Sequence, residues 1–237
     1  MADTLVLLPG WGLGPAAMEP LAQALRVAMP HLRVEVEPLP AGGGLEHVLG
    51  ELDRVVPADA WLLGWSLGGM LAIALAAARG AACPGVITLA SNACFVAREG
   101  WPAAMQGATF SAFSGLCEAD PTGTLKRFAL LCAQGSPEAR ALAKRLVPDS
   151  PGYADPAGLA LLASMDNRPA LARLAVPQLH VFASADALVP AQAAKALVQL
   201  APRARVAALE GSHALPVEAV HLVAAQATAF IKEPTHG

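Results

Sequence analysis

Short apolar runs alternate along the chain with longer segments in which apolar residues recur at helical spacing. The short runs, several of them bounded by glycine or proline, predict buried strands, and the periodic segments predict helices. The predicted strands are Thr4–Leu8, Leu32–Val36, Trp61–Trp65, Val86–Ala90, Leu179–Ala183 and Val206–Leu209. The predicted helices are Pro15–Ala28, Leu45–Val56, Leu67–Arg79, Ala191–Leu200 and Pro216–Ile231. This alternation predicts an α/β protein with a mostly parallel sheet flanked by helices.

The segment 95–175 interrupts the alternation. Its pattern is mostly helical, with turns at Pro121 and Gly135, and it contains no run that predicts a strand. We therefore expect a helical cap at 95–175, inserted into a core formed by 1–94 and 176–237.

The composition narrows the class of protein. Hydrophobic residues make up 55% of the 237 residues and charged residues 15%, a balance that favours a packed domain over disorder. A net charge of −3 and a single tyrosine argue against a nucleic-acid-binding surface. The apolar stretch Leu67–Ala78 is interrupted by glycines and is shorter than the roughly 20 residues of a membrane span, so no membrane contact is expected. The four cysteines lack CxxC spacing and the N-terminus lacks a signal-peptide pattern, which predicts free thiols and a cytoplasmic protein.

Gly64-Trp65-Ser66-Leu67-Gly68 matches the pattern G-x-S-x-G between a predicted strand and a predicted helix. A serine on so tight a turn presents its hydroxyl as a nucleophile, and the two glycines relieve the crowding that the turn creates. The amide of Leu67, at the start of the helix, can face an oxyanion. The alternative is a glycine-rich turn in which Ser66 only caps the helix.

A nucleophilic serine needs a base and an acid, expected in the order Ser, Asp, His. His213 is the one of six histidines that lies in a loop between the last predicted strand and the last helix, where parallel sheets bind ligands. Asp186 lies just beyond the preceding strand, although it could instead cap a turn or helix. Asp155 and Asp166 lie in the insertion, farther from His213 in the predicted topology. The predicted triad is Ser66, Asp186 and His213.

The turn Pro9-Gly10-Trp11-Gly12 follows the first predicted strand. Its glycines allow close approach of the backbone, so the amide of Trp11 is a candidate second oxyanion donor. The alternative is a simple turn that buries Trp11 in the core.

These motifs resemble those of the α/β-hydrolase superfamily over the whole chain. More narrowly, the chain resembles the family of esterases that hydrolyse the methyl ester of pimeloyl-[acyl-carrier protein] in biotin synthesis. The matching segments are Pro9–Leu13, Leu63–Gly69, Ala93–Pro102 and Arg127–Leu131. The chain departs from the family at Pro9, where histidine is frequent, and at Cys132, where glutamine can occur.

The resemblance implies a serine carboxylesterase that releases methanol and needs no metal or organic cofactor. It places Trp11 and Leu67 at the oxyanion site. Substrate contacts are implied for a cap segment made of Phe128, Ala129, Leu130, Leu131 and Cys132. Other readings of the same motifs are a broad short-chain esterase or lipase, a C–C hydrolase, or a catalytically silent binding protein.

Basic residues cluster within the insertion although the chain as a whole is acidic. The cluster comprises Lys126, Arg127, Arg140, Lys144 and Arg145. Acyl carrier proteins are strongly acidic, so we expect Arg127, Arg140 and Lys144 to dock the carrier on a monomeric enzyme. The alternative is an ordinary solvated helix face.

Overall fold

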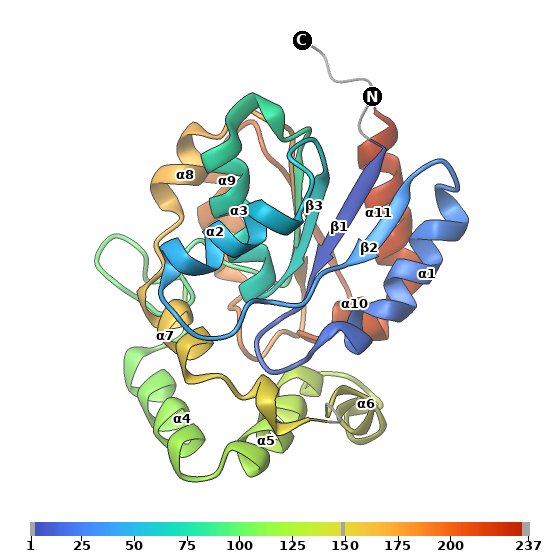
Figure 1. Ribbon diagram of the computed structural model, residues 1–237. Helices are drawn as coiled ribbons and strands as arrows, with labels where there is room; N and C mark the ends of the chain where they lie inside the picture. The colour runs from blue at the N-terminus through green and yellow to red at the C-terminus, as the bar shows by residue number, and fades with distance from the viewer. Residues whose placement is uncertain (1–2, 148–149, 234–237) are drawn as a thin grey trace.

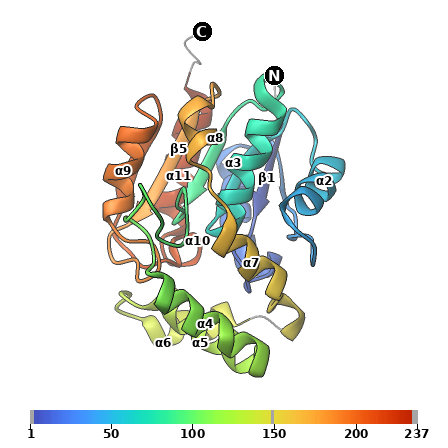
Figure 2. The ribbon, with the colours of Figure 1, turned by 90° about the vertical axis from the view of Figure 1, so that its left-hand side faces the viewer.

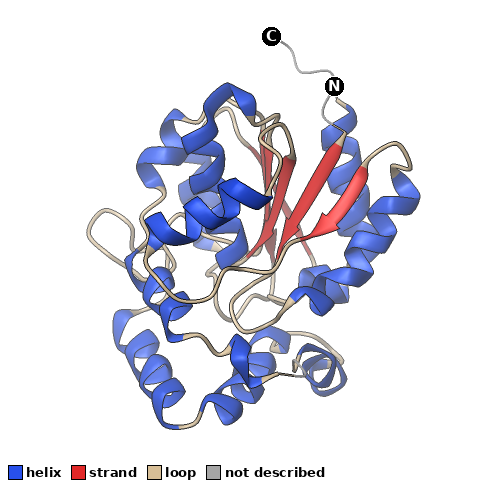
Figure 3. Cartoon of the chain, in the orientation of Figure 1, coloured by secondary structure: helices blue, strands red, loops and turns tan. Residues whose placement is uncertain are grey.

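The computed structural model describes residues 3–147 and 150–233, and its centre is one parallel sheet. Six strands follow the order β2-β1-β3-β4-β5-β6, and every neighbouring pair is parallel (Figure 3). The strands are β1 (Thr4–Leu8), β2 (Arg33–Val36), β3 (Trp61–Trp65), β4 (Val86–Leu89), β5 (Gln178–Ala183) and β6 (Arg205–Leu209). The predicted fold class is confirmed. β4 ends before Ala90 because that residue has a φ of 45°, outside the extended region.

Helices cover both faces of the sheet. On one face lie α1 (Glu19–Ala28), α10 (Leu215–Glu218) and α11 (Val220–Lys232) (Figure 1). On the other face lie α2 (Leu45–Val55), α3 (Leu67–Arg79), α8 (Arg168–Arg173) and α9 (Gln192–Leu200). None of the helices in the described ranges is long and apolar enough to cross a bilayer.

Two predicted helices are divided in the structure. The segment predicted as Pro15–Ala28 begins with a 3-10 turn over Pro15–Met18, and the α-helix starts beside Pro20, which has no amide to donate to an earlier turn. The helix predicted as Pro216–Ile231 is broken at Ala219, which has φ −118° and ψ 38°. The carboxylate of Glu218 bonds back to Ser212, which keeps α10 with the loop that precedes it.

Much of the chain between β4 and α8 forms a layer beyond the carboxyl ends of the strands (Figures 1 and 2). This layer holds α4 (Gly107–Ala119), α5 (Pro121–Ala133) and α6 (Ala139–Leu146), and α7 (Pro156–Ser164) leads back to the core. Asp120 caps α5 by accepting a hydrogen bond from Gly123 N at 2.8 Å, and Asp155 caps α7 by accepting one from Ala157 N at 3.0 Å. In each case a proline at the first helical position fixes the direction of the helix.

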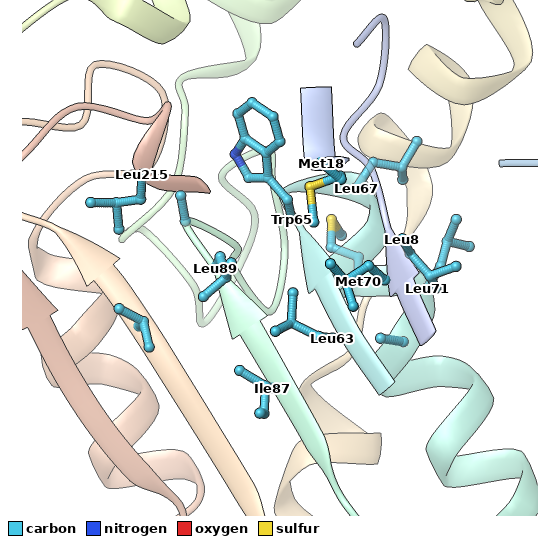
Figure 4. Packing of buried hydrophobic residues seen from close by; sticks show 14 of the residues in the cluster. Leu8, Met18, Leu63, Trp65, Leu67, Met70, Leu71, Ile87, Leu89 and Leu215 are labelled. Carbon is cyan, nitrogen blue, oxygen red and sulfur yellow. The ribbon is translucent and has the colours of Figure 1, made fainter. Parts of the chain in front are cut away.

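The core packs α3 against the centre of the sheet. Leu63 and Trp65 of β3, Leu89 of β4 and Met70 of α3 are all fully buried, and Figure 4 shows them in one continuous cluster. Dense packing of this kind leaves the end of β3 little freedom. The turn that follows β3 is therefore built on a rigid base.

Candidate active site

Ser66 forms the turn between β3 and α3 in a strained backbone conformation. Its φ of 54° and ψ of −115° lie outside the regions that non-glycine residues normally occupy, at a cost of about 1–3 kcal/mol. Two hydrogen bonds hold it there: Ser66 N donates to Leu89 O at 2.9 Å, and Ser91 Oγ donates to Ser66 O at 2.8 Å. Strain of this kind persists only where the surrounding structure enforces it.

The glycines that flank Ser66 allow the backbones around the turn to touch. A Cβ at Gly64 would lie 2.2 Å from Gly68 O, and a Cβ at Gly68 would lie 2.4 Å from the carbonyl oxygens of Leu8 and Pro9. No side chain fits at either position. The G-x-S-x-G spacing is thus a packing requirement of this turn.

Asp186 and His213 form a hydrogen-bonded pair in the interior. His213 Nδ1 lies 2.8 Å from Asp186 Oδ2, and the two side chains are 0% and 1% exposed, respectively. Asp186 Oδ1 also accepts hydrogen bonds from Leu188 N at 2.8 Å and from Val189 N at 2.9 Å. These contacts orient the carboxylate so that the neutral imidazole keeps its proton on Nδ1 and leaves Nε2 as an acceptor.

Trp65 connects this pair to the serine turn. Its indole Nε1 donates a 2.9 Å hydrogen bond to His213 O, and in Figure 4 the indole nitrogen points toward the segment that carries Leu215. His213 Nε2 is buried and has no hydrogen-bond partner among the described residues. The structure therefore pairs His213 with Asp186 and holds His213 next to the serine turn through Trp65, but it records no hydrogen bond from Ser66 to the imidazole.

The loop before α10 is held by Glu218. One carboxylate oxygen of Glu218 accepts hydrogen bonds from Ser212 N at 2.8 Å and from Ser212 Oγ at 2.6 Å. Partial burial acts to raise the pKa of Glu218, but the hydrogen bonds from Ser212 and Ser136 hold it below its ordinary value. The carboxylate stays ionised and fixes the residue that precedes His213.

A turn of the insertion contacts both loops of the acid–base pair. Ala214 N donates a 3.1 Å hydrogen bond to Cys132 O, at the end of α5. Gly135, with φ 99°, lies so close to the other loop that a Cβ there would be 2.3 Å from Ala185 O. The segment 132–136 thus packs against the loop of Asp186 and the loop of His213 together.

The turn after β1, which carries a candidate oxyanion donor, lies against Ser66. A Cβ at Gly10 would be 3.4 Å from Ser66 Cβ. Trp11 and Leu67 both line a cavity of about 230 Å³. Its other lining residues include Leu39, Pro40, Ala41, Val48, Leu71, Tyr153, Asp155, Gly158 and Leu161. The two residues that carry the candidate oxyanion donors therefore line one mostly apolar cavity.

The indole of Trp11 is fixed by the insertion. Its Nε1 donates a 2.7 Å hydrogen bond to Asp155 O, and its ring meets those of Phe113 and Phe128 edge to face, with centroids 5.7 and 5.1 Å away. Gly158 of α7 packs on the indole so closely that a Cβ there would lie 2.5 Å from Trp11 Cδ1. The side chain of Trp11 forms a wall between the core and the insertion.

The five residues predicted to contact substrate lie on α5 and face different directions. Phe128, Ala129 and Cys132 are buried, whereas Leu130 is 52% exposed. A helix turns 100° per residue, so consecutive positions cannot share one face. Phe128 reaches the site through Trp11, and Leu131 is half-buried against the core.

The candidate docking residues lie on the outer surface of the insertion. Arg127 on α5 and Arg140 and Lys144 on α6 are exposed, and the two helices pack against each other. None of the three has an ion-pair partner within 3–147 and 150–233. Their charges are available to an approaching molecule.

The cysteines and acids of the insertion do not assemble a metal site. In the part of the chain that the structure describes, no group of three His, Cys, Asp or Glu side chains could hold a metal ion. The four cysteines are buried and unpaired. Burial, together with the neighbouring carboxylate of Asp166, raises the pKa of the Cys94 thiol to about 12, so this thiol stays protonated.

Sequence reasoning missed Ser91, Glu218 and the structural role of Asp155. Ser91 is a polar side chain two residues beyond the end of β4, and Glu218 lies five residues after the predicted base His213. These positions were the available signal. Their partners, Ser66 O and the amide of Ser212, are main-chain groups that no residue pattern reports.

Comparison with known proteins assigns the class. The sequence model described as "Alpha/beta hydrolase family" matches residues 5–226. In solved structures, the bromoperoxidase from Bacillus anthracis is similar in fold, with a TM-score of 0.84 and 18% identity over 98% of this chain and 93% of that one. The esterase from Exiguobacterium antarcticum has a TM-score of 0.82 and 19% identity over 98% of this chain and 92% of that one. The chain belongs to the α/β hydrolase family.

Curated relatives place the chain more narrowly. It is 36% identical to the pimeloyl-[acyl-carrier protein] methyl ester esterase of Vibrio cholerae over 84% of this chain and 82% of that protein. It is 40% identical to the biotin biosynthesis bifunctional protein BioHC of Cellvibrio japonicus over 88% of this chain. This chain spans less than half of that protein, 43% of its length. Within its class, the chain belongs to the family of pimeloyl-[acyl-carrier protein] methyl ester esterases, and the resemblance seen in the motifs is confirmed.

Proposed function

We propose that this chain is a serine carboxylesterase that hydrolyses the methyl ester of pimeloyl-[acyl-carrier protein] to the free acid and methanol. The observation that carries the proposal is the Asp186–His213 pair: His213 Nε2 has no partner within the described residues, and the Trp65 bond to His213 O holds this residue next to the strained Ser66 turn. The identity to esterases of that name over most of the chain supports the substrate.

The chemistry follows from the roles of these groups. Ser66 Oγ attacks the ester carbonyl while His213 Nε2 takes its proton, and Asp186 stabilises the imidazolium. The amides of Trp11 and Leu67 stabilise the oxyanion of the tetrahedral intermediate. The intermediate expels methoxide, which takes the proton from His213 and leaves as methanol. Water then attacks the acyl-enzyme, with His213 again as base, and releases the carboxylate and free Ser66.

The partner in this proposal is the acyl carrier protein that holds the substrate. The exposed cations Arg127, Arg140 and Lys144 lie on one layer, the insertion that we propose as a cap over the site. An acidic carrier would be attracted to this layer and oriented by it. We propose that the reaction takes place in the cytoplasm, in keeping with four unpaired thiols.

The test compares two substrates with and without the nucleophile. The wild-type chain should hydrolyse the carrier-linked methyl ester faster than free dimethyl pimelate, and Ser66→Ala should lose roughly 10⁶-fold in kcat, as loss of the nucleophile does in serine proteases. Equal rates on the two esters would support a broad carboxylesterase instead. Turnover that survives Ser66→Ala, or no turnover of any ester, would overturn the proposal.

A further inference from the structure

Asp155 contacts three separate segments around the cavity. Its Oδ1 caps α7 through Ala157 N, its Oδ2 accepts a 2.9 Å hydrogen bond from Gly42 N, and its main-chain oxygen accepts the 2.7 Å bond from the Trp11 indole. Gly42 and Trp11 lie 113 and 144 residues from Asp155 along the chain. One residue thus joins the loop after β2, the turn after β1 and the start of α7.

The loop that Asp155 holds is rich in glycine, and its middle glycine, Gly43, packs on His47, where a Cβ would lie 2.4 Å from His47 Cδ2. Gly42, Gly43 and Gly44 follow one another, Gly42 and Gly43 both have φ 72°, and a Cβ at Gly42 or Gly44 would meet no other atom within 4 Å. Consecutive glycines lose much conformational entropy when they are ordered. The hydrogen bond from the Gly42 amide to Asp155 therefore adds to the His47 contact in fixing where the loop lies.

This loop and its neighbours form one wall of the cavity. Leu39, Pro40 and Ala41, directly before Gly42, line it together with Leu67 and Trp11. The segment of Asp155 closes the same cavity, because the ring of Tyr153 lies 2.9 Å from where a Cβ of Gly14 would be. The bond between Asp155 and Gly42 links the segment of Asp155 to the loop that carries these three lining residues.

We propose that Asp155 is a specificity-determining positioning residue, which sets the width of the cavity that receives the apolar chain of the ester. It acts through the Gly42 amide and the Trp11 indole and does not touch the reacting atoms. The proposal rests on the proposed function, since it takes the substrate to be an ester with an apolar chain. It predicts that acyl-chain preference changes when the loop is released while helix capping is kept.

The test uses Asp155→Ser. Serine is also a good helix cap, so α7 keeps its first turn. Its side chain has a single oxygen, however, and this leaves no second oxygen to accept the hydrogen bond from Gly42 N. Asp120→Ser is the matched control, because Asp120 caps α5 in the same way through Gly123 N and contacts neither the loop nor Trp11 through that carboxylate. A general loss of stability would affect both variants.

Hydrogen exchange and kinetics read out the two parts of the proposal. In Asp155→Ser, the Gly42 amide should exchange faster than in wild type, whereas α7 should keep its protection. The ratio of kcat/KM for p-nitrophenyl hexanoate to that for the acetate should fall about three- to tenfold, mainly through KM, the factor expected from one hydrogen bond of ordinary net strength. Asp120→Ser should change neither quantity.

Two results would overturn the inference. Unchanged exchange at Gly42 would mean that Asp155 does not hold the loop. Faster exchange with an unchanged hexanoate-to-acetate ratio would mean that the contact is structural only. If wild type hydrolyses neither ester, it is the proposed function that fails, and the exchange experiment still decides whether Asp155 positions the loop.

Discussion

The indole of Trp65 donates a 2.9 Å hydrogen bond to the main-chain oxygen of His213. Trp65 directly precedes Ser66, so this bond connects the Ser66 turn to the proposed base, His213. Trp65→Phe keeps a ring in the core but removes this bond. We expect kcat to fall about two- to tenfold, as for loss of one ordinary hydrogen bond, with a smaller change in KM. Steady-state kinetics on a p-nitrophenyl ester measures both.

Trp61→Phe is the control for that change. Trp61 lies on the same strand and packs on Phe230 with ring centroids 5.9 Å apart, away from the His213 loop. The Trp61→Phe variant should therefore have a kcat near the wild-type value. Equal losses in the two variants would show that Trp65 acts only through core packing.

Asp186→Asn should abolish most activity while the fold is retained. An amide at this position favours the wrong imidazole tautomer, and the analogous change in a serine protease lowers kcat about 10⁴-fold. Asp166→Asn is the comparison, because the carboxylate of Asp166 pairs with Arg168 instead. It should keep its activity. An active Asp186→Asn together with an inactive Asp166→Asn would assign the acid to the insertion.

Reversing the exposed charges of the insertion should affect only the carrier-linked substrate. The triple change of Arg127, Arg140 and Lys144 to Glu should lower kcat/KM for the carrier-linked ester about 10- to 10³-fold at low salt, the contribution of electrostatic steering. The loss should shrink as salt rises, because a Debye length of about 8 Å at physiological ionic strength screens exposed charges. Hydrolysis of a p-nitrophenyl ester should hardly change.

A charge-matched variant controls for net charge. Arg173, Lys195 and Arg203 are exposed and lie outside α5 and α6, and their reversal to Glu changes the net charge by the same amount. This variant should have the same kcat/KM for the carrier-linked ester as wild type. If both triple variants lose the same activity, steering depends on total charge, and no docking surface exists on α5 and α6.

Acid should destabilise the fold partly through His180. Burial lowers the pKa of this histidine from 6.5 to about 4, and its neutral ring bonds Thr88 Oγ1 at 2.7 Å. Between these two pH values the unfolded chain binds a proton that the folded chain does not, so stability falls as pH drops from about 6.5 to 4. The loss from this group is about 3 kcal/mol, at 1.36 kcal/mol for each pKa unit.

Urea unfolding at several pH values measures this dependence. In His180→Phe the stability should decrease less over the same pH range, even if the variant is less stable at pH 7 because Thr88 has lost its partner. An unchanged pH slope would show that His180 does not titrate in this range.

The sequence predicted the features that depend on neighbouring residues or on strand order. The Ser66 turn is one of these, because Gly64 and Gly68 are required within a few residues of it. Asp186 and His213 are another, because both follow neighbouring strands and their loops end at the same edge of the sheet.

The contacts of Asp155 and Glu218 could not be predicted in the same way. Asp155 contacts segments more than 100 residues away: its carboxylate accepts from the Gly42 amide, and its main-chain oxygen accepts from the Trp11 indole. Each bond involves a main-chain group, and the residue type does not reveal which main-chain group takes part. The break at Ala219 has a similar origin, since it accompanies the bond between Glu218 and Ser212 and no proline or glycine stands there. Bonds from side chains to the backbone leave no periodic trace in the sequence, whether they span 6 residues or more than 100.

The turn at 132–136, which packs against both Ala185 and Ala214, has a consequence for how the molecule acquires its activity during synthesis. The Ser66 turn can form as soon as the first four strands and α3 have left the ribosome. The loops of Asp186 and His213 are synthesised much later. Their contacts with the turn at 132–136 can form only then, because that turn lies some 50 to 80 residues earlier in the chain. In the function proposed above, a nascent chain would therefore hold the Ser66 turn before the proposed acid and base are in place, and the site would be complete only when the last quarter of the chain has docked.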